Sequence, residues 1–180
     1  MNCNQLDNIF RGCDNNMGGI QKFYVAAYND VAVATEAVTG DGIIDTITMA
    51  STSPAAEFVE FEFKKGTSSF VEDATLAQEG GTEYIPTSTI MLHRRDVDKR
   101  NALALLAAGQ QNLFIIIKDQ NDIYWAQGWL RGANLTAIGE GSGTVGTDGS
   151  KYSLTFVGAE PQAMPQVSDS AMATLPGITL

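Results

Sequence analysis

The chain has 180 residues and a formal net charge of −10, which comes from 11 basic and 21 acidic side chains. This length is typical of a single domain, and a hydrophobic content of 44% is typical of a globular protein. The excess of acid argues against a dedicated nucleic-acid binder, because such proteins use Lys and Arg to displace the counterions around phosphates.

The sequence predicts a soluble protein made in the cytosol, with no metal, cofactor or membrane partner. Residues 1–19 lack the basic start and apolar core of a secretory signal. The longest apolar run, 113–117, is far shorter than the roughly 18 residues of a membrane helix. We therefore expect Cys3 and Cys13 to be reduced thiols, and two cysteines without further ligands nearby make a poor zinc site.

After an N-terminal arm (1–19), residues 20–160 are expected to form one mainly β domain, a sandwich or barrel with extended hairpin and loops. Short strands punctuated by Gly, Asn and Asp support this class. The expected strands are 20–27, 43–49, 59–64, 69–76, 84–92, 113–117, 123–130, 135–138 and 152–157. Segment 113–117 has no polar alternation, so it should be a central strand covered on both faces.

One helix, at about 96–108, is expected to flank the β structure. Asp96 is a suitable N-cap, and Gly109 is placed to end the helix. Its apolar face, which should pack on a sheet, contains Ala102, Leu103, Leu105 and Leu106.

Segment 59–64 has the clearest period-two pattern, with Val59, Phe61 and Phe63 alternating with polar side chains. Residues 64–67 have the chemistry of a hairpin turn, and 69–76 would be the return strand. The charged residues of this hairpin are Glu57, Glu60, Glu62, Lys64, Lys65, Glu72 and Asp73. Alternating Glu on an exposed strand indicates a solvated face more often than a glycosidase acid–base pair.

Basic residues gather next to the expected helix start. Arg94, Arg95, Lys99 and Arg100 lie within seven positions. They are either an ordinary exposed helix start or a patch that meets acid on another copy of the chain, in a heterologous contact that closes into a ring. Both interpretations stay open.

No catalytic role is assigned. His93 is the only histidine, and the sequence has no nucleophile elbow of the G-x-S-x-G type. Residues 141–146 have the glycine spacing of a dinucleotide fingerprint, but a strand follows them where that motif requires a helix. We interpret them as a β loop.

The C-terminal extension, 161–180, has one charged residue, Asp169, and loses the strand period. Six large apolar side chains make it unlike a free solvated tail. We expect it to dock, either on its own domain or on a neighbouring subunit, and we favour the neighbour.

Several segments in order resemble one family. They are Gly12-Cys13, Gly18-Gly19-Ile20, the run from Phe61 to Phe70, the helix after Arg95-Asp96, the run from Leu113 to Trp129, Gly141-Ser142-Gly143-Thr144, and the run from Tyr152 to Pro161. Together they cover most of residues 12–167. The chain thus resembles the tail tube (major tail) and tail ring proteins of tailed bacteriophages, especially those of Bacteroidetes phages.

The resemblance implies a virion structural protein whose copies, six to a ring, stack into a tube or form a tail ring through which DNA passes. Its partners would be further copies, other tail or connector proteins, and DNA that is not bound specifically. The hairpin would pair with that of a neighbouring subunit or line the lumen, and its charged residues are Glu57, Glu60, Glu62, Lys64, Lys65, Glu72 and Asp73. In the lumen, Glu60 and Glu62 would repel phosphate. The alternative is a non-catalytic β-sandwich binding module for carbohydrate or protein, with Tyr124, Trp125 and Trp129 as a stacking platform. An enzyme is the least favoured class.

Overall fold

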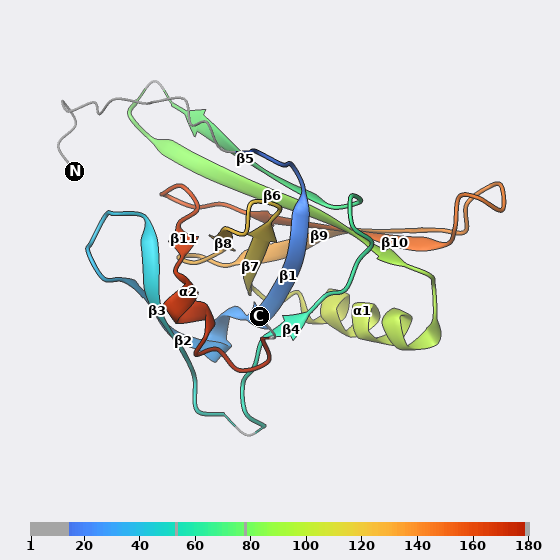
Figure 1. Ribbon diagram of the computed structural model, residues 1–180, viewed down its shortest axis with the longest axis horizontal. Helices are drawn as coiled ribbons and strands as arrows, with labels where there is room; N and C mark the ends of the chain where they lie inside the picture. The colour runs from blue at the N-terminus through green and yellow to red at the C-terminus, as the bar shows by residue number, and fades with distance from the viewer. Residues whose placement is uncertain (1–14, 53, 78, 179–180) are drawn as a thin grey trace.

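The computed structural model describes residues 15–52, 54–77 and 79–178, and it is mainly β (Figure 1). The strands are β1 (Ile20–Ala27), β2 (Val31–Glu36), β3 (Ile43–Met49), β4 (Val59–Glu60), β5 (Ser69–Leu76), β6 (Thr82–His93), β7 (Leu113–Asp119), β8 (Tyr124–Gln127), β9 (Ala133–Gly141), β10 (Lys151–Gly158) and β11 (Gln166–Val167). The helices are α1 (Val97–Gly109), α2 (Asp169–Met172) and the 3-10 turn η1 (Tyr28–Asp30). The predicted class, a β-sandwich with one flanking helix, is confirmed. The elements β2, β11 and the short α2 were not predicted.

The strands form one continuous sheet that bends into two parts. A seven-stranded sheet has the order β4-β1-β7-β8-β11-β3-β2, and a four-stranded sheet has the order β9-β10-β6-β5. The two parts meet at a single pair, where Leu113 lies opposite Ala133. Within the four-stranded sheet every pairing is antiparallel.

Two hydrophobic clusters lie on opposite faces of β1 and β7. The first cluster fills the space between the two sheets, where Phe23 and Ile115 pack with Leu154 and other side chains of β6 and β10. The second cluster lies on the other face, where Phe114 and Ile116 pack with β3 and the C-terminal residues. The prediction of a central strand covered on both faces is therefore confirmed.

A buried polar side chain joins the two sheets. Gln127 of β8 is fully buried, and its Oε1 accepts a hydrogen bond from the Ser88 hydroxyl at 2.7 Å. Its Nε2 donates to the carbonyl oxygens of Pro86 at 2.9 Å and Phe156 at 3.2 Å. Because every polar atom of this amide is satisfied, it fixes β8 against β6 and β10 without the cost of an unpaired buried group.

The predicted hairpin between 59–64 and 69–76 is wrong in its pairing. β4 pairs with β1, and β5 pairs with β6. The turn expected at the tip does form, since the Thr67 N–H donates to the Lys64 carbonyl at 3.2 Å and Gly66 has a φ of 79°. A turn can therefore form without the strands on either side of it pairing with each other.

The side chains of this segment explain where it goes. Phe58 is buried in the second cluster and Phe61 packs against the first, while the Phe61 N–H donates to the Phe23 carbonyl at 2.9 Å. Val59, predicted to face the dry side, is 54% exposed. The period-two pattern indicated which residues alternate between the two faces. The partner strand, β1, was decided by Phe58 and Phe61, which pack into the clusters on its two faces.

The C-terminal residues are part of the core. Val167 and Met172 are buried in the second cluster, and the Phe58 N–H donates to the Pro176 carbonyl at 3.1 Å. The expectation that this segment docks on a neighbouring subunit is therefore wrong for residues 164–178, which pack within their own chain. They cover the face of β1 and β7 that the four-stranded sheet leaves open.

Helix α1 begins and ends close to the predicted positions. The Asp96 carboxylate accepts a hydrogen bond from the Lys99 N–H at 2.8 Å, which confirms the N-cap. The helix includes Gly109, and the left-handed residue that follows it is Gln110, with a φ of 42°. The left-handed C-terminal position is thus one residue later than the glycine suggested.

Candidate assembly surfaces

The acidic residues predicted for one hairpin are divided between the two sheets. Glu57 and Glu62 are exposed on either side of β4, and Glu60 is half-buried with its carboxylate 4.0 Å from the Lys22 ammonium. These three residues lie with the seven-stranded sheet.

The other two acids lie on β5 of the four-stranded sheet. Glu72 accepts a hydrogen bond from the Met164 N–H at 2.7 Å, and Asp73 is exposed. The five carboxylates therefore do not form the single acidic surface that the hairpin implied.

The two lysines of the expected hairpin turn lie with other basic residues. Lys64, His93 and Lys151 line one small pocket of about 170 Å³, and Lys65 follows in the chain. His93 and Lys151 are opposite each other on β6 and β10. This group extends the basic patch predicted at the start of α1.

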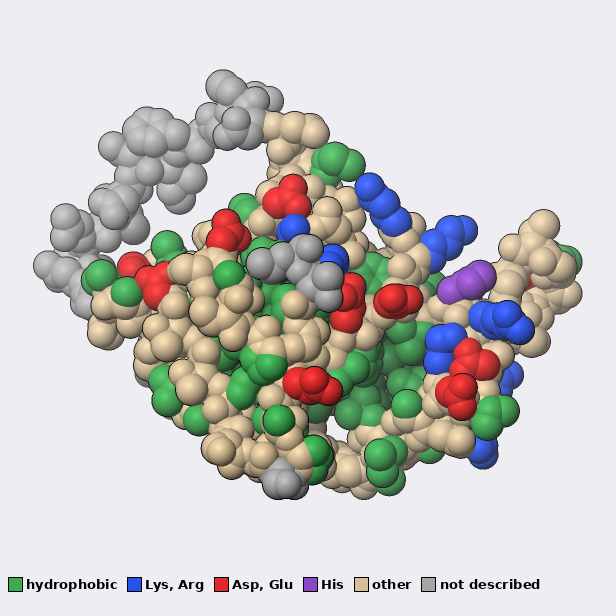
Figure 2. Space-filling view, turned by 60° about the horizontal axis from the view of Figure 1, so that its bottom comes forward, with side chains coloured by type: hydrophobic (Ala, Val, Ile, Leu, Met, Phe, Trp, Pro, Cys, Tyr) green, Lys and Arg blue, Asp and Glu red, His purple; other side chains and the backbone are tan. Residues whose placement is uncertain are grey.

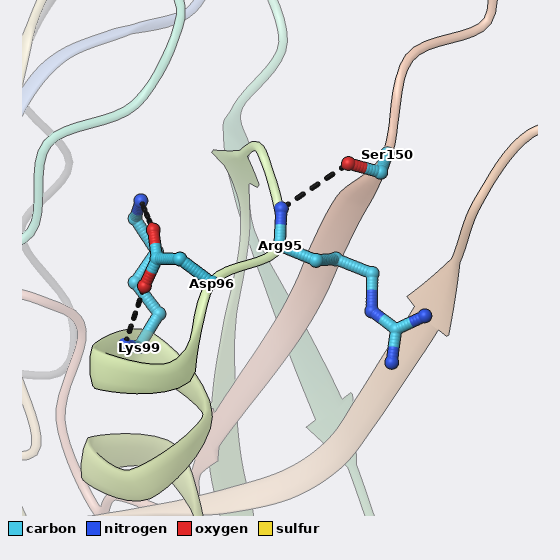
Figure 3. Close-up of polar contacts among 4 residues, drawn as sticks. All are labelled: Arg95, Asp96, Lys99 and Ser150. Carbon is cyan, nitrogen blue, oxygen red and sulfur yellow. Dashed lines mark hydrogen bonds and ion pairs between the residues drawn. The ribbon is translucent and has the colours of Figure 1, made fainter.

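Arg95, in the basic patch, is held by its own chain (Figure 3). Its guanidinium lies 2.7 Å from the Glu140 carboxylate and 5.6 Å from the centre of the Tyr152 ring. The backbone N–H of Arg95 donates to the Ser150 hydroxyl at 3.2 Å. A side-chain hydrogen bond with Tyr152, together with Glu140, raises the pKa of Arg95. Arg95 therefore positions the end of β10 more than it presents charge to a partner.

Lys99 is likewise paired with Asp96, which lowers the pKa of that carboxyl. Arg94 and Arg100 differ, because both are exposed and neither has a carboxylate within 4.0 Å among the residues that the structure describes. Of the four predicted patch residues, Arg94 and Arg100 are thus the ones available to a partner.

The outer edge of β5 is an unprotected strand edge. Within the described ranges no strand pairs with it, and its eight residues pair with β6 without a bulge. The Ala77 N–H donates to the Gly81 carbonyl across the hairpin, and the Tyr84 N–H, opposite Ala74, donates away from β5 to Glu160. Because ladder bonds alternate along a strand, the N–H of Ala74 points outward.

The same alternation directs the N–H groups of Phe70, Glu72 and Leu76 outward. Glu72 lies opposite Pro86, which has no N–H to give, and this agrees with a pair that makes no ladder bond. Strand edges of this length are usually blocked by Lys, Pro or a bulge. β5 has none of these, and of its two charged side chains Glu72 is hydrogen-bonded to the Met164 N–H and Asp73 is exposed. Its outward N–H groups are therefore suited to receive another strand.

The opposite edge of the four-stranded sheet is β9. Beyond its contact at Ala133, no strand among the described residues pairs with its outer edge. Residues 134–138 line an open groove of about 430 Å³, whose other wall is the C-terminal end of α1 with Leu106 and Gln110. An added strand would therefore enter a groove and would not lie on a flat surface.

The outer face of the four-stranded sheet is rich in hydroxyl groups. This face is opposite the one that carries Ile90, Leu154 and Phe156 into the first cluster. The outward hydroxyl residues at its centre are Ser69, Thr87, Thr89, Ser153 and Thr155, and the apolar residues beside them on the same face are Val71, Met91 and Val157. Charged side chains on this face, such as Asp73 and Lys151, lie away from that centre.

A further open groove lies between α1 and β4. Leu103 is buried, but Leu105, predicted to face a sheet, is 76% exposed beside it, and Val59 forms the opposite wall. The groove has a volume of about 480 Å³. Figure 2 shows hydrophobic side chains along a hollow on this side of the molecule.

The three aromatic residues considered for sugar stacking do not share an exposed surface. Tyr124 is buried, Trp125 packs against the first cluster and Trp129 packs against the second. The Trp125 indole N–H donates to Asp119 at 3.2 Å. These rings therefore offer no common stacking platform.

The cysteines, the histidine and the acidic residues offer no metal site in the described part of the chain. Cys3 and Cys13 lie outside the described residues, and His93 is exposed. Among the residues that the structure describes, no group of three or more His, Cys, Asp or Glu is arranged to hold a metal ion. In the same part of the chain, no helix is both long and apolar enough to cross a membrane.

No family model, no curated protein and no solved structure matches this chain.

Proposed function

We propose that the chain is a virion structural subunit whose copies close into rings of a phage tail tube or tail ring. The observation that carries the proposal is the four-stranded sheet whose outer strands, β5 and β9, have edges that pair with no further strand among the described residues, apart from Ala133 of β9. The resemblance described above supplies the six-fold ring and the passage of DNA, and the proposal requires no cofactor and no catalytic group.

The strand directions favour closure between neighbours. Because the sheet has an even number of antiparallel strands, β5 and β9 run in opposite directions. In a ring, each copy has the same orientation along the ring axis, so β5 of one copy meets β9 of the next in antiparallel fashion. The two strands have eight and nine residues, and β9 has a bulge at Thr136, so the regular pairing would lie along residues 137–141.

Such a ring removes both free edges, as in a closed barrel. The seven-stranded sheet covers the inner face of the four-stranded sheet and adds bulk behind it, which fits on the wider outside of a ring. The hydroxyl-rich outer face then lines the lumen, with Thr89 and Thr155 near its centre.

In this arrangement Glu60 and Glu62 lie with the outer shell and do not line the lumen, which differs from the expectation drawn from the sequence. Short neutral hydroxyls neither attract phosphate as Lys and Arg do nor repel it as carboxylates do. DNA would pass along such a wall without being held at fixed positions.

The test is Ala74→Pro, compared with Ala74→Val. Proline removes only an outward N–H on β5, and proline is tolerated on edge strands, so the subunit should fold normally. Valine keeps the N–H and serves as the matched control. We expect wild type and Ala74→Val to form rings, measured by native mass spectrometry and electron microscopy, and Ala74→Pro to be monomeric with an unchanged circular dichroism spectrum.

Two outcomes would count against the proposal. A wild-type protein that remains monomeric at high concentration and at every salt concentration contradicts ring formation. Rings of Ala74→Pro in the same yield as wild type would show that the β5 edge is not the site of closure.

A further inference from the structure

The basic side chains are gathered at one end of the molecule. Seven of the eleven Lys and Arg residues lie where β6 ends and where α1 and β10 begin. We define the cationic end by the exposed members of this group that have no carboxylate within 4.0 Å among the described residues: Lys64, Lys65, Arg94, Arg100 and Lys151. In Figure 2 most of the blue side chains lie toward the right, around the single histidine.

Three carboxylates at the cationic end are engaged within the chain, and a fourth, Asp98, is exposed in the first turn of α1. Asp96 caps α1 and pairs with Lys99, and Glu140 pairs with Arg95. Asp148 accepts hydrogen bonds from the N–H groups of residues 144 and 145 at 2.7 and 3.0 Å. The exposed cations of this end therefore keep a local excess of positive charge.

The opposite end of the long axis is acidic. It holds the β5–β6 turn and the β2–β3 connection, which Figure 1 shows on the side away from the start of α1. We define the acidic end by Glu36, Asp41, Glu79 and Glu83. The acidic end takes its residues from 23–63 and 66–93, two ranges that contain no Lys or Arg.

The two ends are too far apart to neutralise each other. β6 runs between them, and its 12 residues span about 40 Å. The Debye length is about 8 Å at physiological ionic strength, so each end acts as an independent charged surface. Glu83 thus lies near the start of this strand, and Arg94 directly follows its last residue.

We propose that copies of this chain associate end to end, with the cationic end of one copy against the acidic end of the next. The partner is a second copy because one molecule presents both complementary surfaces, and a heterologous contact of this kind does not close on itself. Within the proposed function, on which the following step rests, strand edges close each ring and strand ends form its two rims. One rim is then basic and the other acidic, so rings stack with a single polarity into a tube.

The test uses two charge-reversed proteins. Lys64→Glu, Arg94→Glu and Arg100→Glu together leave two cations against three carboxylates at the cationic end, so both ends are acidic. Asp41→Lys, Glu79→Lys and Glu83→Lys together leave one carboxylate against three lysines at the acidic end, so both ends are basic. All six side chains are exposed, so both variants should fold. Arg94→Lys with Arg100→Lys is the matched control, because it changes two of the same positions and preserves their charge.

We expect wild type and the lysine control to form tubes at low salt, and each reversed variant alone to form single rings. An equimolar mixture of the two reversed variants should recover tubes, because acidic and basic rims then alternate. High salt should shorten the tubes of wild type and of the mixture. Tubes formed by either reversed variant alone, or no recovery on mixing, would overturn end-to-end pairing.

The outcome is informative even without rings. If the wild-type chain stays monomeric, ring closure fails, and sedimentation at low salt then measures end-to-end pairing alone. The mixture should sediment as a larger species than either variant by itself. Equal sedimentation of the mixture and of its two components would overturn end-to-end pairing.

Discussion

Gly177 is the position at which docking of the C-terminal segment can be measured most directly. It has a φ of 79°, and a Cβ atom added there would lie 2.1 Å from the Phe58 carbonyl oxygen. The neighbouring Pro176 carbonyl accepts the Phe58 N–H, and Leu175 is 6% exposed. Gly177→Ala should therefore push the end of the chain away from Phe58.

The size of the effect follows from the groups that move. An alanine at positive φ costs about 1–2 kcal/mol by itself. Loss of the hydrogen bond to Phe58 adds about 0.5–1.5 kcal/mol, and exposure of Leu175 adds about 1.5–3 kcal/mol. We expect Gly177→Ala to lower the free energy of unfolding by about 3–6 kcal/mol.

Gly40→Ala is the matched control. Gly40 has a φ of 86°, but an added Cβ would meet nothing within 4 Å. This variant therefore has the cost of an alanine at positive φ but no steric clash, and its free energy of unfolding should fall by only about 1–2 kcal/mol.

Urea unfolding followed by the fluorescence of Trp125 and Trp129 measures both variants. With a slope of about 2 kcal/mol per molar urea, Gly177→Ala should unfold about 1.5–3 M earlier than wild type. Equal losses in the two variants, within about 0.5 kcal/mol, would refute docking of this segment. A difference between the variants that changes on tenfold dilution would indicate docking on another copy.

Two further predictions concern single carboxyl groups. Burial raises the pKa of Glu160, whose Oε1 accepts the Arg131 N–H at 3.1 Å while Oε2 is buried without a hydrogen-bond partner. Because its ionisation in the folded state becomes a cost as the pH rises above the ordinary pKa of 4.5, Glu160→Gln should stabilise the protein at neutral pH. Denaturation at neutral pH and below pH 4.5 measures this gain in the free energy of unfolding, which should vanish at the lower pH. An equal gain at the two pH values would contradict the prediction. Asp96→Ala should lower the free energy of unfolding by about 0.5–2 kcal/mol, because it removes the N-cap hydrogen bond from the Lys99 N–H. Asp96→Asn keeps an acceptor at this position and should lower it little. Equal losses in the two variants, measured by denaturation, would assign the effect to the exposed ion pair with Lys99 instead.

Much of the local structure could be predicted from the sequence because it depends on neighbouring residues. The cap at Asp96 needs only an acceptor side chain three positions before an N–H, and α1 begins there. The apolar run in β7 predicted a strand buried on both faces for the same reason, since no polar residue interrupts it.

The partners of the strands could not be predicted in this way. The pattern in 59–64 was interpreted as one arm of a hairpin, but β4 pairs with β1, where Phe58 and Phe61 reach two different clusters. Gln127 gave no sequence signal, because an amide is satisfied at the joint between two sheets only when the sheets have come together.

The net charge of −10 shows the same division. The sequence by itself determined that residues 23–63 and 66–93 contain no Lys or Arg and that cations gather around residue 94. Only the tertiary structure decided that Glu79 and Glu83 lie at the opposite end of β6 from Arg94, and that Lys64 lies beside Lys151 of β10. The physical reason is that composition fixes how much charge the chain carries, while strand pairing over long sequence separations decides where that charge meets solvent.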